Sequence, residues 1–119
     1  MTVSNHDLRT LVHRSCLCLD EGDWDGYLEL CASGFNYQVV NYSPELRQDM
    51  VWMEQDRAGM AALLGNLENH ITRPGQFLRH ASVALIEPGE DDVTRRLTSS
   101  FVIAYTELDG VSSLFTVGR

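Results

Sequence analysis

The sequence predicts an α+β domain in which N-terminal helices pack on one face of a curved antiparallel sheet. The first part of the chain has apolar residues at helical spacing, interrupted at Gly22 and again at Ser33 and Gly34. From Phe77 onward, apolar and polar residues alternate, with a strong hairpin signal at Asp109 and Gly110. Helices followed by a meander of strands are typical of an α+β fold.

The first expected helix begins near Ser4 and Asn5, which can both cap it, and ends at Gly22. Asp7 in the first turn interacts favourably with the helix dipole. Leu17 lies opposite the main apolar stripe, so both sides of the helix need cover, which indicates a contact beyond its own core. The stripe consists of Leu8, Leu11, Val12, Ser15, Cys16 and Leu19.

The middle of the chain predicts a short helix, a strand and a longer helix. Asp23 caps the short helix, and residues 35–42 alternate as a strand that ends before Pro44. Residues 49–54 fit either a short strand or an irregular loop. Asp56 then caps the longer helix. Its apolar stripe is Met60, Leu63, Leu64 and Leu67.

Three further strands are expected at residues 77–87, 93–108 and 111–119. The last of them would leave an uncovered sheet edge, which folded proteins usually protect. We therefore expect residues 1–119 to form a single, C-terminally incomplete domain that lacks its last strand.

Composition excludes several classes of function. The chain of 119 residues has a net charge of −8, and all nine of its basic residues are arginine. This acidity disfavours binding to nucleic acids and to anionic membranes. There is no apolar run of about eighteen residues and no ordinary signal peptide, so we expect a cytoplasmic protein. The odd number of cysteines indicates reduced thiols.

Three short landmarks resemble a known family. An apolar segment (Val51, Trp52, Met53) precedes the helix start at Asp56 and Arg57, and the pair Arg79 and His80 opens the first long strand. With the helix–helix corner at 20–28, this order resembles the nuclear transport factor 2-like (cystatin-like) fold. Within it, the chain resembles the small (β) subunits of ring-hydroxylating dioxygenases and other Rieske-type oxygenases, including the methanesulfonate monooxygenase small subunit. The proline-rich loop usual before the Arg–His pair is reduced here to residues 72–75.

The resemblance implies a cone-like curved antiparallel sheet with the N-terminal helices on its concave face. It also implies a β subunit that has no catalytic residue, cofactor site or metal site of its own. The Rieske iron–sulfur cluster and the mononuclear iron belong to the large α subunit, and three α and three β subunits commonly assemble. Both dioxygenation and monooxygenation stay open, as does a non-aromatic substrate.

The residue inventory agrees with this implication. A Rieske site needs two cysteines and two histidines at fixed spacing, and the four histidines here have no such partners. No spaced pair of histidines with a carboxylate suggests a mononuclear iron site. Phosphate-binding and nucleophile-elbow motifs are also missing from the sequence.

Two other functions remain open from the sequence. A cofactor-independent isomerase, dehydratase or cyclase would use Asp56 or His80 as general base, with Tyr105 among the donors to a developing oxyanion. Each residue also has a structural explanation: a helix cap for Asp56, a strand-end contact for His80 and the core for Tyr105. A homodimeric ligand-binding or scaffold module is the other possibility.

For subunit contact the candidates are Leu17, Trp52, Arg57 and Arg79. An exposed apolar run around Trp52 would be a liability unless another surface covered it. The alternative for Trp52 is burial in the domain's own core. For Arg57 and Arg79 the alternative is pairing within the chain or with solvent.

Overall fold

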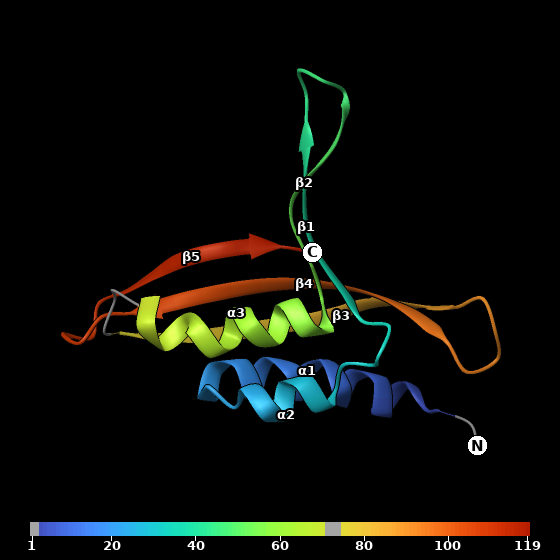
Figure 1. Cartoon of the computed structure of the whole chain (residues 1–119), viewed down its shortest axis with the longest axis horizontal. Helices are drawn as coiled ribbons and strands as arrows, with labels where there is room; N and C mark the ends of the chain where they lie inside the picture. Colours follow the sequence, from blue (N-terminus) through green and yellow to red (C-terminus); the bar gives the residue numbers. More distant parts are fainter. Residues whose placement is uncertain (1–2, 71–74) are drawn as a thin grey trace. The chain divides into compact units, whose positions relative to one another are not determined.

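The computed structural model describes residues 3–70 and 75–119, and it has the predicted α+β fold (Figure 1). The chain divides into two compact units. The first, here called the sheet unit, combines Met1–Asp23 with Thr72–Arg119. The second, the hairpin unit, is Trp24–Ile71.

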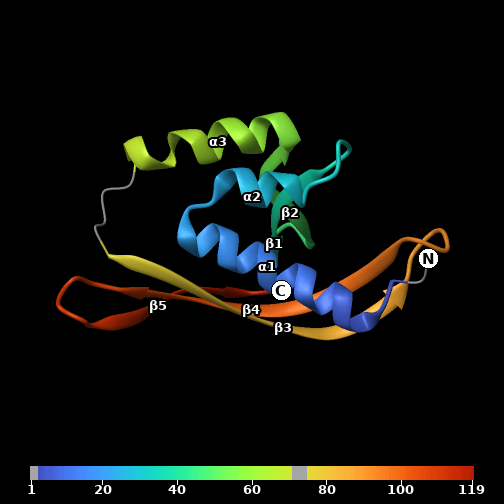
Figure 2. The same ribbon diagram turned by 90° about the horizontal axis from the view of Figure 1, so that it is seen from below.

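The sheet unit consists of one helix on a three-stranded antiparallel sheet. Helix α1 (Asn5–Glu21) packs along strand β3 (Gln76–Pro88), and the sheet order is β3-β4-β5. Strands β4 (Arg95–Thr106) and β5 (Ser112–Gly118) complete it. Figure 2 shows β3 and β4 bending along their length, with α1 on the inner side of the bend. A curved sheet with the N-terminal helix on its concave face was the expected arrangement.

Local capping explains the bounds of α1. The Ser4 hydroxyl accepts a hydrogen bond from the Asp7 N–H (3.1 Å), and the Asp7 carboxylate accepts one from the Ser4 N–H (3.3 Å). This reciprocal arrangement satisfies two backbone donors that the helix leaves open. At the other end Gly22 adopts the left-handed conformation (φ 71°), and the Asp23 N–H donates to the Cys18 carbonyl. Both predicted ends of the helix are confirmed.

The register of the strands assigns residues to two faces of the sheet. Phe77 lies opposite Tyr105, and Arg79 lies opposite Ile103, so these four share the inner face. Tyr105 is only 5% exposed there, and its ring lies 5.0 Å from that of Phe77. Leu11 of α1 does not join this core: it is 45% exposed, so its predicted place in the buried stripe is wrong.

The hairpin unit consists of two helices and a two-stranded hairpin. Helix α2 (Trp24–Glu29) packs on α3 (Arg57–His70), which also contacts strands β1 (Asn36–Ser43) and β2 (Gln48–Asp56). The small core of this unit contains Tyr27, Met60 and Leu64. The last two belong to the stripe that the sequence predicted for this helix.

The segment that the sequence left open is a strand. Residues 48–56 pair with β1 along its whole length, but the register shifts between Val39 and Val40. Val39 pairs with Met53 and Val40 pairs with Val51, so Trp52 has no opposite partner and forms a β-bulge. The reduced loop at residues 72–75, by contrast, lies almost entirely outside the described residues.

Replacing Gly22 by alanine should destabilise the protein by about 1 kcal/mol, because its left-handed backbone disfavours a Cβ atom. Thermal or urea unfolding of the variant measures this loss. Gly34→Ala is the matched control, since an added Cβ there meets no atom within 4 Å. Equal losses for both variants would contradict the role of Gly22 as a helix cap.

Candidate functional site

Asp56, one of the two candidate bases, is a helix cap in the structure. Its carboxylate accepts a hydrogen bond from the Gly59 N–H at 2.7 Å, at the start of α3. This satisfies one of the open donors in the first turn of the helix and places a negative charge at the positive end of the dipole. The side chain is exposed, whereas the general base of a cofactor-independent isomerase would lie in an enclosed apolar space.

His80 and Tyr105 do not form a common site. His80 pairs with Val102 and Tyr105 pairs with Phe77, so the two side chains lie three positions apart and on opposite faces of the sheet. The Tyr105 hydroxyl accepts a hydrogen bond from the Gly75 N–H at 3.0 Å. His80 is exposed on the outer face.

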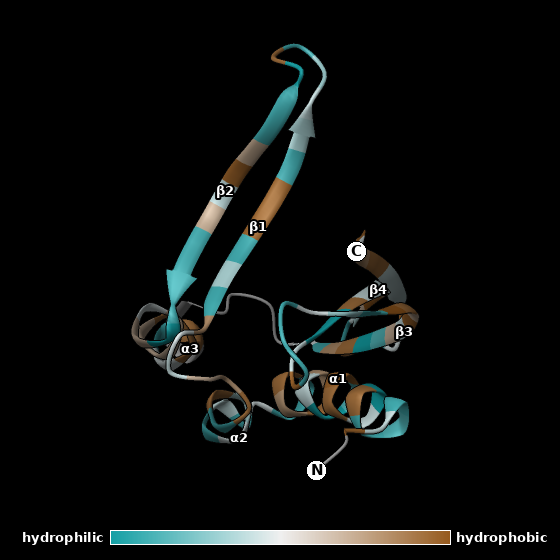
Figure 3. Cartoon of the chain, turned by 90° about the vertical axis from the view of Figure 1, so that its right-hand side faces the viewer, coloured by the Kyte–Doolittle hydropathy of each residue, from teal (hydrophilic) through white to brown (hydrophobic). Residues whose placement is uncertain are grey.

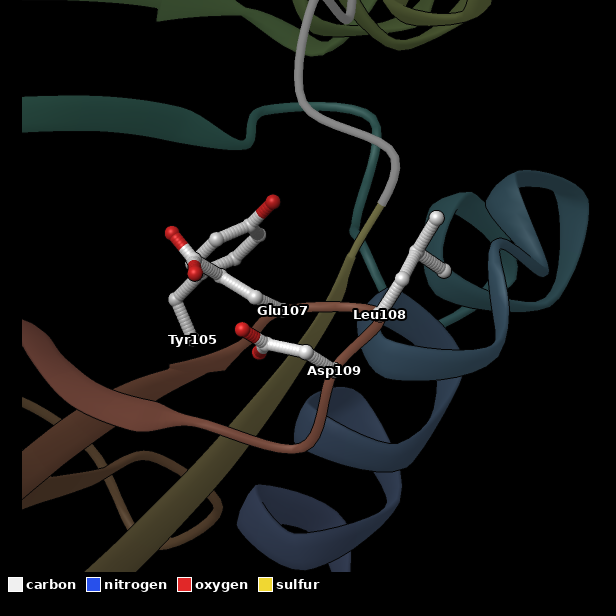
Figure 4. Close-up of a pocket in the computed structure, with 4 residues that line it drawn as sticks. All are labelled: Tyr105, Glu107, Leu108 and Asp109. Carbon is white, nitrogen blue, oxygen red and sulfur yellow. The ribbon is translucent and has the colours of Figure 1, made fainter.

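An open hollow of about 350 Å³ lies at the turn between β4 and β5 (Figure 4). Tyr105, Glu107, Leu108 and Asp109 line it. In the close-up, Tyr105 and Glu107 lie on one side of the turn and Leu108 lies on the other. Both carboxylates are exposed to solvent. Neither of the candidate bases, Asp56 and His80, lines this hollow.

The donor groups do not fit a resident metal ion in the part of the chain that the structure describes, because no three His, Cys, Asp or Glu side chains gather there. The three cysteines are free thiols. Burial, together with the nearby Asp20 carboxylate, raises the pKa of Cys16 above the usual value. Burial likewise raises the pKa of Cys31. A raised pKa leaves less reactive thiolate at neutral pH.

Arg79 is paired within the sheet unit. Its guanidinium donates to one carboxylate oxygen of Asp20 at 2.7 Å, and its backbone N–H donates to the other at 2.9 Å. The side chain of Asp20 is 9% exposed and that of Arg79 is 25% exposed. Asp20 lies in the last turn of α1, where a carboxylate is unfavourable unless a cation offsets it. The pair therefore fastens the end of α1 to β3.

Arg57 is paired within the hairpin unit. Its guanidinium donates to the Leu28 carbonyl from Nε (3.3 Å) and Nη2 (2.9 Å), and to the Cys31 carbonyl from Nε (3.2 Å). The Leu28 carbonyl lies in the last turn of α2 and also accepts the Cys31 N–H (3.1 Å), and the Cys31 carbonyl lies just beyond the helix, so the guanidinium adds hydrogen bonds at this helix end. Arg57 thus joins the start of α3 to the end of α2. An interface role for either arginine stays a prediction.

The two apolar candidates are exposed. Leu17 is 55% exposed on α1, and Trp52 is 70% exposed on β2. The alternative that Trp52 lies in the domain's own core is therefore wrong. Other large apolar side chains of the same hairpin are also exposed, and the sequence analysis did not single them out: Val40 and Tyr42, which lie in the predicted strand, and Leu46, which lies in the turn between β1 and β2.

No helix in the described part of the chain combines the length and the apolar character needed to cross a membrane. No family model matches the chain. Over 112 residues it is 30% identical to the methanesulfonate monooxygenase hydroxylase subunit beta of Methylosulfonomonas methylovora. The aligned residues make up 94% of this chain and 62% of the relative. Over 100 residues it is 29% identical to the 2-aminobenzenesulfonate 2,3-dioxygenase subunit beta of an Alcaligenes species. Here the aligned residues make up 84% of this chain and 66% of the relative.

The chain thus spans slightly less than two thirds of the length of these two relatives. Among solved structures, it resembles a β subunit assigned to the aromatic-ring-hydroxylating dioxygenases, from Novosphingobium aromaticivorans. The TM-score is 0.76, the identity is 19%, and the match covers 93% of this chain and 71% of the other. At this identity the match shows a common fold.

Replacing Asp20 by alanine should lower the free energy of unfolding by about 2 kcal/mol, because the part-buried Arg79 guanidinium and N–H both lose their acceptor. Glu21→Ala is the control. It removes an exposed neighbouring carboxylate on the same helix and should change stability by less than about 0.5 kcal/mol. Denaturant titrations of both variants measure the difference. Indistinguishable midpoints would refute the fastening role of Asp20.

The thiols of Cys16 and Cys31 should react with iodoacetamide more slowly in the native protein than in the unfolded chain at pH 8. Their raised pKa leaves them mostly protonated there, and the rate should rise as the pH approaches the native pKa. Mass spectrometry of quenched samples measures the labelling of each site. Labelling at the unfolded rate would show that burial does not protect these thiols.

Proposed function

Since this chain is related to the β subunits of ring-hydroxylating dioxygenases and of methanesulfonate monooxygenase, we propose that it is the non-catalytic small subunit of a Rieske-type oxygenase. The observation that supports this most directly is a similarity that extends over 94% of the chain. Its role is to assemble with a large α subunit. The Rieske cluster and the mononuclear iron belong to that partner.

The placement of the alternative catalytic residues also supports an assembly role. Asp56 caps a helix, the Tyr105 hydroxyl bonds to backbone, and His80 is exposed on the other face of its sheet. A cofactor-independent isomerase would instead need a base and an oxyanion donor facing one enclosed space.

We further propose that the two compact units form one domain and that three such β subunits assemble with three α subunits in the cytoplasm. Subunit contacts involve Leu17 and Trp52, whose side chains are exposed. Arg57, which directly follows β2, and Arg79, which pairs with Asp20 on the helix that carries Leu17, contribute to the same contacts. Removing a large exposed apolar side chain from water is favourable, so assembly would stabilise this chain.

The two relatives suggest a substrate class for the complex. One is named for methanesulfonate and the other for 2-aminobenzenesulfonate, so the feature common to both names is a sulfonate group. We propose that the complete oxygenase oxidises an organic sulfonate.

Coexpression with the large oxygenase subunit of the same organism tests the assembly role. Size-exclusion chromatography with light scattering should show a complex that contains both chains, with all of the iron in the large subunit. A stable monomer that binds no large subunit, or turnover by this chain alone, would refute the proposal.

Oxygen uptake by the assembled complex, supplied with an electron donor that reduces the Rieske cluster, tests the substrate class separately. Methanesulfonate or 2-aminobenzenesulfonate should stimulate uptake, and benzoate, an unsulfonated acid, serves as the control. Equal stimulation by benzoate would leave the subunit role standing and would remove the sulfonate proposal.

A further inference from the structure

The hairpin of β1 and β2, residues 36–56, projects from α3 as a two-stranded arm (Figure 3). Apolar residues lie in the middle of both strands, as the hydropathy colours show. Most of its large apolar side chains are exposed: Val40, Tyr42, Leu46, Met50, Val51, Trp52 and Met53. A two-stranded hairpin is at best marginally stable in water, so an arm of this composition needs another surface to cover it.

The register shows that the arm is apolar on both faces. Val40 and Val51 are opposite each other on one face, beside Tyr42. Met53, opposite Val39, lies on the other face, and Met50 follows on that side beyond the bulge. A single flat surface could cover only one of these faces. The arm therefore fits a groove, whose two walls contact both faces at once.

The bulge distinguishes Trp52 from the other side chains of the arm. A bulged residue has no cross-strand neighbour, and bulges commonly redirect a side chain and increase the local twist. Here the bulged residue is a tryptophan that is 70% exposed, and the residues before and after it in the strand are also apolar. Tryptophan is among the residues that most often dominate the binding energy of an interface.

Charge indicates the chemistry of the groove. The arm has four carboxylates, Glu45, Asp49, Glu54 and Asp56, and one basic residue, Arg47, so its formal net charge is −3. Asp49 and Glu54 share the face of Val40 and Val51 and stand at either end of that apolar patch, about 15 Å apart along the strand. A second copy of this chain, with its net charge of −8, would repel the arm.

We propose that the arm inserts into an apolar groove of the large oxygenase subunit, with Trp52 as its anchor. Basic residues at the two ends of the groove pair with Asp49 and Glu54. This inference rests on the proposed function. It adds the segment that binds the large subunit and the chemical character of the groove that this segment enters. An apolar centre with a charged rim is the common anatomy of specific interfaces.

Replacing Trp52 by serine should weaken binding to the purified large subunit by at least about 30-fold. Leu108→Ser, which removes a similarly exposed apolar side chain from the turn between β4 and β5, is the matched control and should change the affinity less than about 3-fold. Titration calorimetry measures both affinities. Tyr42→Ser, on the same arm, should also weaken binding and provides a second test if the first variant folds poorly.

The double variant Asp49→Asn, Glu54→Gln should slow association about 10-fold at low salt, because steering by opposite charges is lost. At high salt it should associate at the wild-type rate, since screening removes the steering from both proteins. Stopped-flow mixing with the large subunit measures these rates. Equal rates at low salt would overturn the pairing of these carboxylates with a basic groove.

The outcomes separate this inference from the function on which it rests. If the wild-type chain does not bind the large subunit, the proposed function fails. If the wild-type chain binds and Trp52→Ser binds equally well, the function stands and the arm inference fails. Light scattering of the chain alone gives a further result: self-association that Trp52→Ser abolishes would show that a second copy covers the arm, and would overturn the choice of partner.

Discussion

The physical constraint on which this structure depends is a surplus of apolar surface. Among the described residues the buried apolar side chains are Tyr27, Met60, Leu64 and Tyr105, whereas many more large apolar side chains are exposed. The hydrophobic effect supplies most of the stability of a folded chain, and a small core supplies little of it. A subunit that covers this surface by assembly gains stability that its own core does not provide.

Polar contacts supplement the small cores. Asp20 and Arg79 fasten α1 to β3, Arg57 ties the end of α2 to the start of α3, and Asp56 caps α3. Two charged candidates for subunit contact and one candidate base are therefore already used inside the chain. This leaves apolar side chains, above all Trp52 at its bulge, as the strongest candidates for contact with another subunit.

Much of the fold could be predicted from the sequence because its signals are local. The capping box at Ser4, the left-handed Gly22 and the hairpin turn at Gly110 each act within a few residues, and they set the ends of helices and strands. The apolar period likewise predicted Met60 and Leu64 as core. The landmarks around Trp52 and Arg79 are local patterns as well, and the resemblance to oxygenase β subunits rests on them.

The tertiary structure alone decided the partners and the exposure of the candidate residues. Arg79 and Asp20 are 59 residues apart in the chain, and no spacing rule links them. The bulge at Trp52 depends on the register of two strands, which a single strand's pattern does not contain. The local sequence determines which secondary structure a segment tends to form. The exposure of its side chains depends on which distant segments pack against it. That is why the sequence could predict Trp52 as a contact residue, but only the structure could show that its side chain is exposed.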